Sequence, residues 1–316
     1  MVGHVEDPDA VDAALDGVDA VYHLAARVGV GQSMYQLCDY TRANNEATSV
    51  LLEALVENPV ERLVVASSMS IYGEGLYRDL AGRRIPGQPR DLKQLQEHAW
   101  ELRAPDGEVL RPVATPETKE SAPSSIYALS KFDQERMCLL VGKAYKIPTV
   151  ALRFFNVYGP RQALSNPYTG VLAIFASRLL NNLSPSIFED GAQQRDFVNV
   201  RDIAQACRLA VEVPEAADQV FNIGSGQHFT ICEVADRLGR LLDKEHIDAE
   251  ITQRYRVGDI RHCYADIARA RSVLGYAPQV AFDDGLVELA GWLDGQIATH
   301  RGDEAHEELA SRGLAV

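Results

Sequence analysis

Four short runs of apolar, strand-forming residues recur along the chain, with helical patterns between them. The runs cover residues 20–24, 63–66, 149–152 and 220–223. Continuous apolar strands are typical of parallel sheets buried on both faces, and parallel strands need long crossover connections, usually helices. The alternation therefore predicts an α/β fold built on a parallel sheet with helices on both of its faces.

Two helices are predicted at definite places. Residues 34–57 carry apolar residues at helical spacing and end near Pro59, so they form a crossover helix between the first two strands. A second helix begins at Ser124 or Ser125, since either hydroxyl can cap its first turn. Both helices are expected to cover the sheet.

Residues 73–125 break this pattern with polar, proline- and glycine-containing sequence. One weak helical stretch, residues 92–102, lies within this segment. Connections of this length without regular structure are usually functional lids or mobile excursions. We therefore expect an insertion here that covers a site.

Charge limits the ligands that the chain can hold. Its 45 acidic and 31 basic residues give a net charge of -14, which opposes general binding to nucleic acid or to an anionic membrane. Any anionic ligand must then be held by locally placed arginines. No apolar run has the length of a membrane span and no signal peptide is visible. Five scattered cysteines without a C-x-x-C pair are typical of reduced thiols, so we expect a cytoplasmic protein.

A tyrosine and a lysine on the second helix provide the first chemical signal. Tyr127 and Lys131 are four residues apart, which places a phenol and an ammonium on one helix face. Such a pair arises by chance in about one of four chains of this composition, so it needs support. The support comes from three strand ends, at residues 22–26, 67–73 and 152–160, which are expected to meet at the same edge of the sheet.

With these segments the chain resembles the extended short-chain dehydrogenase/reductases, over residues 3–296. It is most similar to the nucleotide-sugar 4-epimerases of the UDP-galactose and dTDP-L-rhamnose types, through residues 127–196. The resemblance implies a Rossmann-like sheet, a smaller C-terminal substrate-binding lobe, NAD as cofactor and a nucleotide-diphosphate sugar as substrate. It also implies a homodimer.

The resemblance assigns roles to individual residues. Tyr127 matches the catalytic tyrosine, Lys131 the lysine that binds the nicotinamide ribose, and Ser68 the catalytic hydroxyl. The implied cofactor-binding residues are Val5, Leu24, Ala25, Ala26, Asn44, Lys131 and Phe154. The implied substrate-binding residues are Ser70, Asn156, Arg195, Arg256 and Asp259, and no metal site is implied.

These roles give a coherent mechanism for 4-epimerisation. A cation ~4 Å from a phenol contributes about 4 kcal/mol at an effective dielectric constant of ~20, so Lys131 is expected to lower the pKa of Tyr127 by roughly three units before desolvation is subtracted. Tyr127 then takes the proton of the sugar's 4-hydroxyl while Ser68 bonds the same oxygen. Met69 and Ser70 stand where the related 4,6-dehydratases carry an acidic pair, which disfavours dehydration.

Two alternatives stay open at this point. A nucleotide-linked 4-ketosugar reductase or dehydrogenase would use the same Ser68, Tyr127 and Lys131 but would consume cofactor. A non-catalytic sugar-nucleotide-binding protein is the second, because the chain begins after the strand, glycine turn and helix that hold the cofactor pyrophosphate in the family. For the same reason we expect the chain as written to bind NAD weakly.

Three other motifs are expected to be structural. The glycine turn at residues 222–226 lacks the Gly-Lys-Ser/Thr ending of a phosphate loop. His262 and Cys263 are adjacent rather than spaced as metal ligands. His23 is expected to shape a strand end.

The expected domain boundaries follow from the resemblance. They are a Rossmann-like NAD-binding domain without its first βαβ unit at 1–160, an insertion or lid at 74–125, a substrate-binding lobe at 161–200 and 223–296, a return to the first domain at 201–222, and a polar tail at 297–316.

Overall fold

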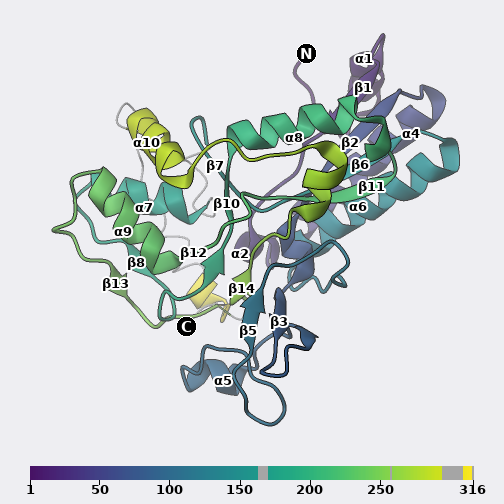
Figure 1. The fold of residues 1–316 in the computed structure, drawn as a ribbon. Helices are drawn as coiled ribbons and strands as arrows, with labels where there is room; N and C mark the ends of the chain where they lie inside the picture. Colours follow the sequence, from purple (N-terminus) through teal and green to yellow (C-terminus); the bar gives the residue numbers. More distant parts are fainter. Residues whose placement is uncertain (163–169, 257, 294–308, 315–316) are drawn as a thin grey trace.

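A parallel four-stranded sheet lies at the centre of the computed structural model, which describes residues 1–162, 170–256, 258–293 and 309–314 (Figure 1). The strand order is β1-β2-β6-β11 and every neighbouring pair is parallel. The strands are β1 (Ala20–His23), β2 (Arg62–Ser68), β6 (Thr149–Phe154) and β11 (Gln219–Ile223). The predicted α/β class with a parallel sheet is confirmed.

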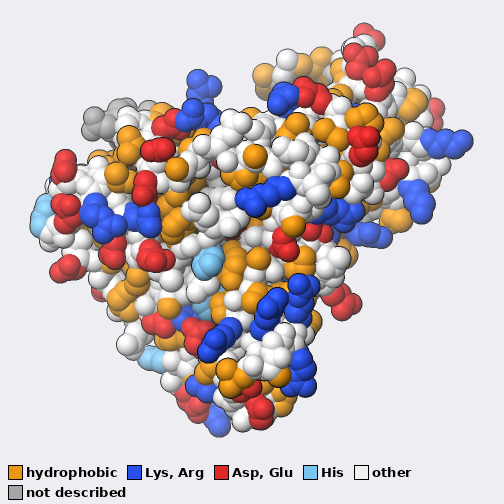
Figure 2. Space-filling model, in the orientation of Figure 1, with side chains coloured by type: hydrophobic (Ala, Val, Ile, Leu, Met, Phe, Trp, Pro, Cys, Tyr) orange, Lys and Arg blue, Asp and Glu red, His pale blue; other side chains and the backbone are white. Residues whose placement is uncertain are grey.

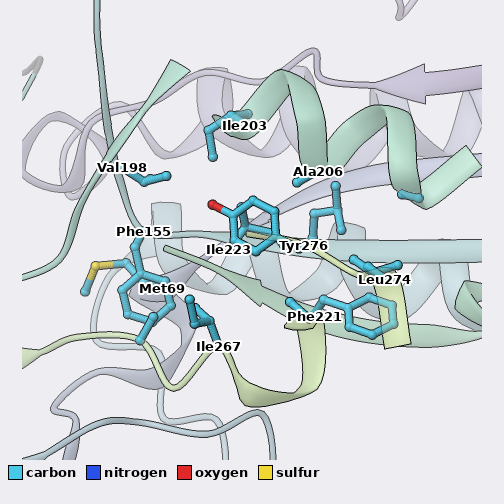
Figure 3. Packing of buried hydrophobic residues seen from close by; sticks show 14 of the residues in the cluster. Met69, Phe155, Val198, Ile203, Ala206, Phe221, Ile223, Ile267, Leu274 and Tyr276 are labelled. Atoms are coloured by element: carbon cyan, nitrogen blue, oxygen red, sulfur yellow. The ribbon is translucent and has the colours of Figure 1, made fainter. Parts of the chain in front are cut away.

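The two faces of this sheet pack against different helices, because successive strand residues point to opposite sides. Val64, Leu152 and Phe221 belong to a core with residues of α8 (Val200–Glu212). Figure 3 shows this side, where Tyr276 lies among Ile203, Ala206 and Ile223. The alternate residues Leu63, Val65 and Ala151 pack with α1 (Pro8–Leu15), α4 (Ala47–Glu57) and α6 (Ile126–Tyr145).

The first crossover is a helix with a local irregularity. The predicted helix at 34–57 is observed as α3 (Leu37–Tyr40), a π-helical segment η1 (Thr41–Glu46) and α4. A short helix, α2 (Val30–Ser33), precedes them. π-Helical turns occur mostly at functional sites, and the buried Asn44 lies within this one.

The insertion at 74–125 has its own antiparallel sheet, in the order β4-β3-β5. Its strands are β3 (Leu76–Arg78), β4 (Arg84–Pro86) and β5 (Arg111–Val113), too short to show an alternating pattern in the sequence. The helix predicted at 92–102 is α5 (Leu92–Gln96), shorter because the chain turns at His98, which has φ 54°. The isolated bridge between Thr115 and Ala265 joins the insertion to the C-terminal part of the chain.

The C-terminal lobe has a separate hydrophobic core. Its centre is formed by buried residues of α7 (Val171–Leu180), α9 (Ile231–Leu241) and α10 (Phe282–Leu293). Small strand pairs complete it, namely β7 (Asn156–Tyr158) with β10 (Phe197–Asn199), β8 (Ser186–Ile187) with β13 (Glu250–Ile251), and β9 (Gln194–Arg195) with β12 (Phe229–Thr230) and β14 (His262–Cys263). The helical turns η2 (Met69–Tyr72), η3 (Pro214–Ala216) and η4 (Ala270–Leu274) belong instead to the connections around the central sheet.

The predicted tail at 297–316 lies outside the described residues except for 309–314. In that stretch Leu309 is buried and the Arg312 guanidinium lies 4.2 Å from the ring centroid of Tyr35. Across the described part of the chain, none of the helices has the length and apolar character needed to cross a membrane. All five cysteines are free thiols.

Candidate active site

Ser68 and Tyr127 meet at the carboxyl end of the central sheet. Ser68 is the last residue of β2, and Tyr127 lies in the first turn of α6. Ser125 caps that helix by accepting a hydrogen bond from Ala128 N at 3.1 Å, so the helix start is the later of the two predicted positions. The side chains of Ser68 and Tyr127 are hydrogen-bonded to each other.

Ser70 supports the hydroxyl of Ser68. Both the backbone nitrogen and the hydroxyl of Ser70 donate to Ser68 Oγ, at 3.2 and 2.8 Å. A serine oxygen has two lone pairs and one hydrogen. With its lone pairs occupied, Ser68 directs its hydrogen to Tyr127, which is the orientation that stabilises a phenolate.

The electrostatic state of Tyr127 differs from the expectation. Burial raises its pKa, and the hydrogen bond with Ser68 lowers it by less. Lys131 does not offset the effect of burial on this pKa, and its ammonium donates to Gln134 Oε1 at 2.7 Å. The expected lowering by Lys131 is therefore absent from this structure, where desolvation dominates.

Lys131 itself is almost completely buried, with 3% of its surface exposed. Burial lowers the pKa of Lys131 to about 8, against a smaller raising effect of Cys138 and Glu135. An ammonium carries three hydrogens, and Gln134 takes one of them. The others have no hydrogen-bond acceptor among the described residues, so they fit a ligand with hydroxyl groups such as a ribose.

Asn44 ties the loop after β1 to α6. Its Nδ2 donates to Arg27 O at 3.1 Å and to Ser130 Oγ at 2.8 Å, and its Oδ1 accepts from Arg27 N at 2.7 Å. Because its amide is fully engaged within the protein, its contribution in this structure is to hold the rim together.

The other residues predicted to face the cofactor lie in two places. Leu24 and Ala25 are exposed where β1 ends, with Ala26 beside them, and Phe154 is partly buried at the end of β6. Since β1 and β2 are parallel neighbours, the exposed end of β1 lies at the same edge of the sheet as Ser68. Val5 instead packs against the core formed by α1, α4 and β2.

The residues predicted to bind the substrate fall into two groups. Asn156 Oδ1 and Arg256 Nε are buried and have no hydrogen-bond partner within the described residues, and the Arg256 guanidinium lies 4.6 Å from the ring centroid of Phe188. Asp259 accepts from the backbone nitrogen of Ile260 at 3.2 Å. Asn156 and Arg256 thus keep polar atoms suited to a ligand.

Arg195 is placed differently. Its Nη1 donates to the backbone oxygens of Gln194 and Arg261, both at 2.9 Å, and its Nη2 donates to Ile260 O. These bonds brace the strand end that precedes β14. In this structure the backbone thus engages both terminal nitrogens of the guanidinium.

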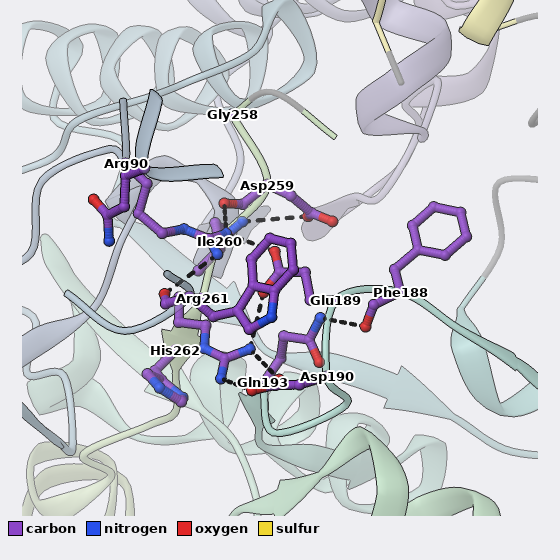
Figure 4. A network of polar contacts seen from close by, with 12 residues as sticks. Arg90, Phe188, Glu189, Asp190, Gln193, Gly258, Asp259, Ile260, Arg261 and His262 are labelled. Atoms are coloured by element: carbon purple, nitrogen blue, oxygen red, sulfur yellow. Dashed lines mark hydrogen bonds and ion pairs between the residues drawn. The ribbon is translucent and has the colours of Figure 1, made fainter. Parts of the chain in front are cut away.

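An ionic junction beside these residues is not visible in the sequence. Arg261, with no exposed surface, is bonded to Glu189, Asp190 and Glu101 (Figure 4). Arg90 of the insertion adds an ion pair to Glu189 at 2.8 Å. The partners are up to 160 positions apart along the chain, so no local spacing could have revealed them. The junction attaches the insertion to the C-terminal lobe.

Comparison with known proteins assigns the family. The profile of the "NAD dependent epimerase/dehydratase family" matches residues 2–92 and 104–224, more than half of the chain. The chain belongs to this family. Family members combine a Rossmann-like sheet with NAD as cofactor, in agreement with the observed sheet and rim. Within the described residues no cluster of three or more His, Cys, Asp or Glu side chains could hold a metal ion.

Individual members of the epimerase/dehydratase family are similar over most of the chain. The dTDP-L-rhamnose 4-epimerase of Burkholderia thailandensis is 33% identical over 300 residues, covering 93% of this chain and 80% of the relative. Among solved structures, the UDP-N-acetylglucosamine 4-epimerase of Methanobrevibacter ruminantium has a TM-score of 0.77 and 29% identity, covering 94% and 83% of the two chains. The UDP-glucuronic acid 4-epimerase of Bacillus cereus, solved as a tyrosine-to-phenylalanine mutant with a fluorinated UDP-sugar and NAD, has a TM-score of 0.76 and 25% identity, covering 93% and 81%.

Proposed function

We propose that this epimerase/dehydratase family member is an NAD-dependent nucleotide-diphosphate-sugar 4-epimerase. The observation that carries the proposal is the hydrogen-bonded pair of Ser68 and Tyr127, one helical turn from the buried Lys131. The similarity to three named 4-epimerases supports it. The residues after Ser68 support it as well, because Met69 and Ser70 provide no carboxylate for a dehydration.

The proposed chemistry begins with proton transfer to Tyr127. In its phenolate form Tyr127 takes the proton of the sugar's 4-hydroxyl, and it returns that proton after the 4-keto sugar has turned over in the site. Ser68 donates to the phenolate and stabilises it. Bound NAD would accept the hydride from carbon 4 and give it back on the opposite face, with no net redox change. Lys131 would hold the ribose hydroxyls through its remaining N–H groups.

The diphosphate of the substrate is negatively charged, and the protein itself is acidic, so a locally placed cation is needed to bind it. Arg256 is the best candidate for the diphosphate, because its Nε has no partner within the described residues and guanidinium forks match phosphate oxygens. Asn156 would bind the sugar through its unpaired Oδ1. Arg195 would act indirectly, by bracing residues 260–261.

The insertion at 74–125 would cover the sugar, as proposed from its length. Because Arg90 and Glu101 bond to Glu189 and Arg261, the insertion would move together with the C-terminal lobe. The lobe at 161–200 and 223–296 would hold the nucleotide sugar. A homodimer remains a prediction from the resemblance, and a cytoplasmic location remains a prediction from the scattered cysteines and the composition of the chain.

The central test is Tyr127→Phe, which removes the proton acceptor and keeps the ring. We expect turnover to fall by on the order of a hundredfold or more, with nucleotide-sugar affinity nearly unchanged. Epimer formation from UDP- and dTDP-sugars is followed by NMR with added NAD, and affinity by calorimetry. Tyr145→Phe is the matched control, since Tyr145 is exposed at the end of the same helix. Undiminished turnover in Tyr127→Phe would overturn the proposal.

The same assay separates an epimerase from a 4-ketosugar reductase. An epimerase needs NAD only in catalytic amount, because the hydride returns to the sugar. A reductase instead consumes NADH or NADPH in proportion to product. Turnover that depends on stoichiometric reduced cofactor would assign the chain to the reductase class.

A further inference from the structure

Lys131 is held by a buried polar network that joins α6 to β1 and α4. Gln134, one turn further along α6 and fully buried, accepts from Lys131 Nζ at 2.7 Å. The Gln134 Nε2 atom lies 2.8 Å from Thr48 Oγ1 and 3.1 Å from His23 Nε2. Thr48 donates in turn to Asn44 O at 2.6 Å. The side chain of Gln134 is therefore fixed at both ends.

The orientation of the Gln134 amide follows from the chemistry of its neighbours. A lysine ammonium can only donate, so the amide atom that faces Lys131 must be the oxygen. The nitrogen then points to Thr48 and His23, which offer acceptors. Burial and the nearby charge of Lys131 lower the pKa of His23 to about 4, so the imidazole is neutral and can accept. The network admits a single orientation.

Within the described residues, no carboxylate forms an ion pair with Lys131. Glu135 lies one turn along α6, but Arg153 binds both of its oxygens, at 2.6 and 2.9 Å. Asp133, two positions from Lys131 on the same helix, accepts from Asn45 Nδ2 at 2.7 Å. The other titratable groups around Lys131 are His23 on β1 and the hydroxyl and thiol of Tyr127 and Cys138 on α6. The ammonium is thus held by a neutral amide in a buried position.

We propose that Gln134 is a positioning residue that fixes the Lys131 ammonium at the rim of the site and keeps it free of a counter-charge. A free ammonium can give its remaining N–H groups to a ligand, and its positive charge acts on neighbouring groups without neutralisation. A carboxylate at the same place would bind the ammonium as an ion pair and remove both properties. This inference deepens the proposed epimerase function and rests on it for its catalytic meaning.

The direct test is the titration of Lys131 in Gln134→Glu, which keeps the side-chain shape and adds one negative charge. The chain has six lysines, so their ε-carbon signals can be followed one by one by NMR in protein labelled with 13C-lysine, without any cofactor. Lys131→Arg identifies the Lys131 signal. We expect the pKa of Lys131, about 8 in the parent, to rise by roughly one to three units, the range for an opposite charge within hydrogen-bond reach.

Two further variants keep this test falsifiable. Gln205→Glu adds the same charge on α8, on the opposite face of the sheet, and should leave the Lys131 titration unchanged. Gln134→Met removes the acceptor and keeps the length, and should lower the pKa of Lys131 below the parent value. An unchanged pKa in folded Gln134→Glu, or an equal shift in Gln205→Glu, overturns the proposal.

The pH dependence of enzyme activity provides a second, independent test. In the enzyme supplied with NAD, Gln134→Glu should move the alkaline limb of the pH–rate profile upward with the pKa of Lys131, and should lower kcat more than it changes KM for the nucleotide sugar. If the NMR titration shifts but neither parent nor variant epimerises any substrate, the position of Lys131 is confirmed and the proposed function fails. If the parent is active and the alkaline limb of Gln134→Glu does not move with the pKa of Lys131, the proposed catalytic role of Gln134 is wrong.

Discussion

Two buried cations in this molecule, Lys131 and Arg261, have opposite kinds of hydrogen-bond partners. Lys131, in the candidate active site, has one neutral hydrogen-bond partner within the described residues, Gln134, and burial lowers its pKa to about 8. Arg261 at the junction of insertion and C-terminal lobe is bonded to three acids, and although burial opposes this, hydrogen bonds to Asp190 and Glu101 raise its pKa. The difference teaches that a buried cation can be left without a counter-charge, as we propose for Lys131 in catalysis, or paired with acids so that it holds two parts of the chain together, as at Arg261.

The same substitution at the two positions should change stability in opposite directions. Arg261→Met removes the ion-pair partner of Asp190 and leaves Glu189 paired with Arg90 alone, and breaking a buried ion pair costs about 3–5 kcal/mol. We expect the free energy of unfolding to fall by this amount in urea titrations. Arg254→Met, at an exposed position in the same lobe, is the control and should change it by less than about 0.5 kcal/mol. A loss below about 1 kcal/mol for Arg261→Met would show that the junction contributes little.

Lys131→Met should stabilise the protein at pH 7. The drop in pKa from 10.5 to about 8 corresponds to about 3 kcal/mol of unfavourable burial in the parent. In the variant this cost is removed, but the Gln134 oxygen loses its hydrogen-bond donor, which costs roughly 1–3 kcal/mol. We expect a net gain of about 1 kcal/mol in the free energy of unfolding, together with loss of activity.

The pH dependence of this gain has a definite sign. Between pH 8 and 10.5 the unfolded parent binds the Lys131 proton and the folded parent does not, so the stability of the parent rises with pH in this window. The advantage of Lys131→Met should therefore shrink between urea titrations at pH 8 and pH 10. A variant that is less stable than the parent at pH 7 would contradict the contrast between the two cations.

Substitutions of exposed charges on the insertion should have the smallest effect on the free energy of unfolding. Arg78 lies directly opposite both Arg84 and Arg111 in the β4-β3-β5 sheet, all three are exposed, and none forms an ion pair within the described residues. Figure 2 shows Lys and Arg side chains gathered over this part of the surface. Facing like charges are destabilising by a few tenths of a kcal/mol per pair.

Arg78→Glu should therefore raise the free energy of unfolding by roughly 0.5–1 kcal/mol, and the gain should diminish with added salt. Arg136→Glu, an exposed position on α6, makes the same change of net charge without facing arginines. An equal gain in both variants would attribute the effect to net charge rather than to the arginine row.

The sequence predicted the sheet because its strands follow local patterns. Apolar runs placed β1, β2, β6 and β11, and Tyr127 with Lys131 fell on one helix face as their spacing required. The insertion was recognised as a segment but not as a sheet, since strands of three residues show no period.

The pKa values and bonding partners of the candidate site residues were harder to predict than their positions in the fold. The spacing of Tyr127 and Lys131 suggested a lowered tyrosine pKa, whereas burial raises it in the structure. Burial depends on how α6 packs against β2, which the spacing of two residues does not contain. For the same reason no local pattern indicated that Arg195 would be engaged by backbone oxygens of residues 260–261.

The sequence by itself therefore determined the α/β class, the strands of the sheet and the placement of Tyr127 and Lys131 on one helix, because each follows from short-range periodicity or a local motif. Only the tertiary structure decided which partner each charged side chain meets. Gln134 reaches Lys131 from one turn away but is fixed by His23, 111 positions distant, and Arg261 is bonded to Glu101, 160 positions distant. Such contacts depend on the packing of distant segments, and the free energy of a buried charge depends on them more than on its neighbours in the chain.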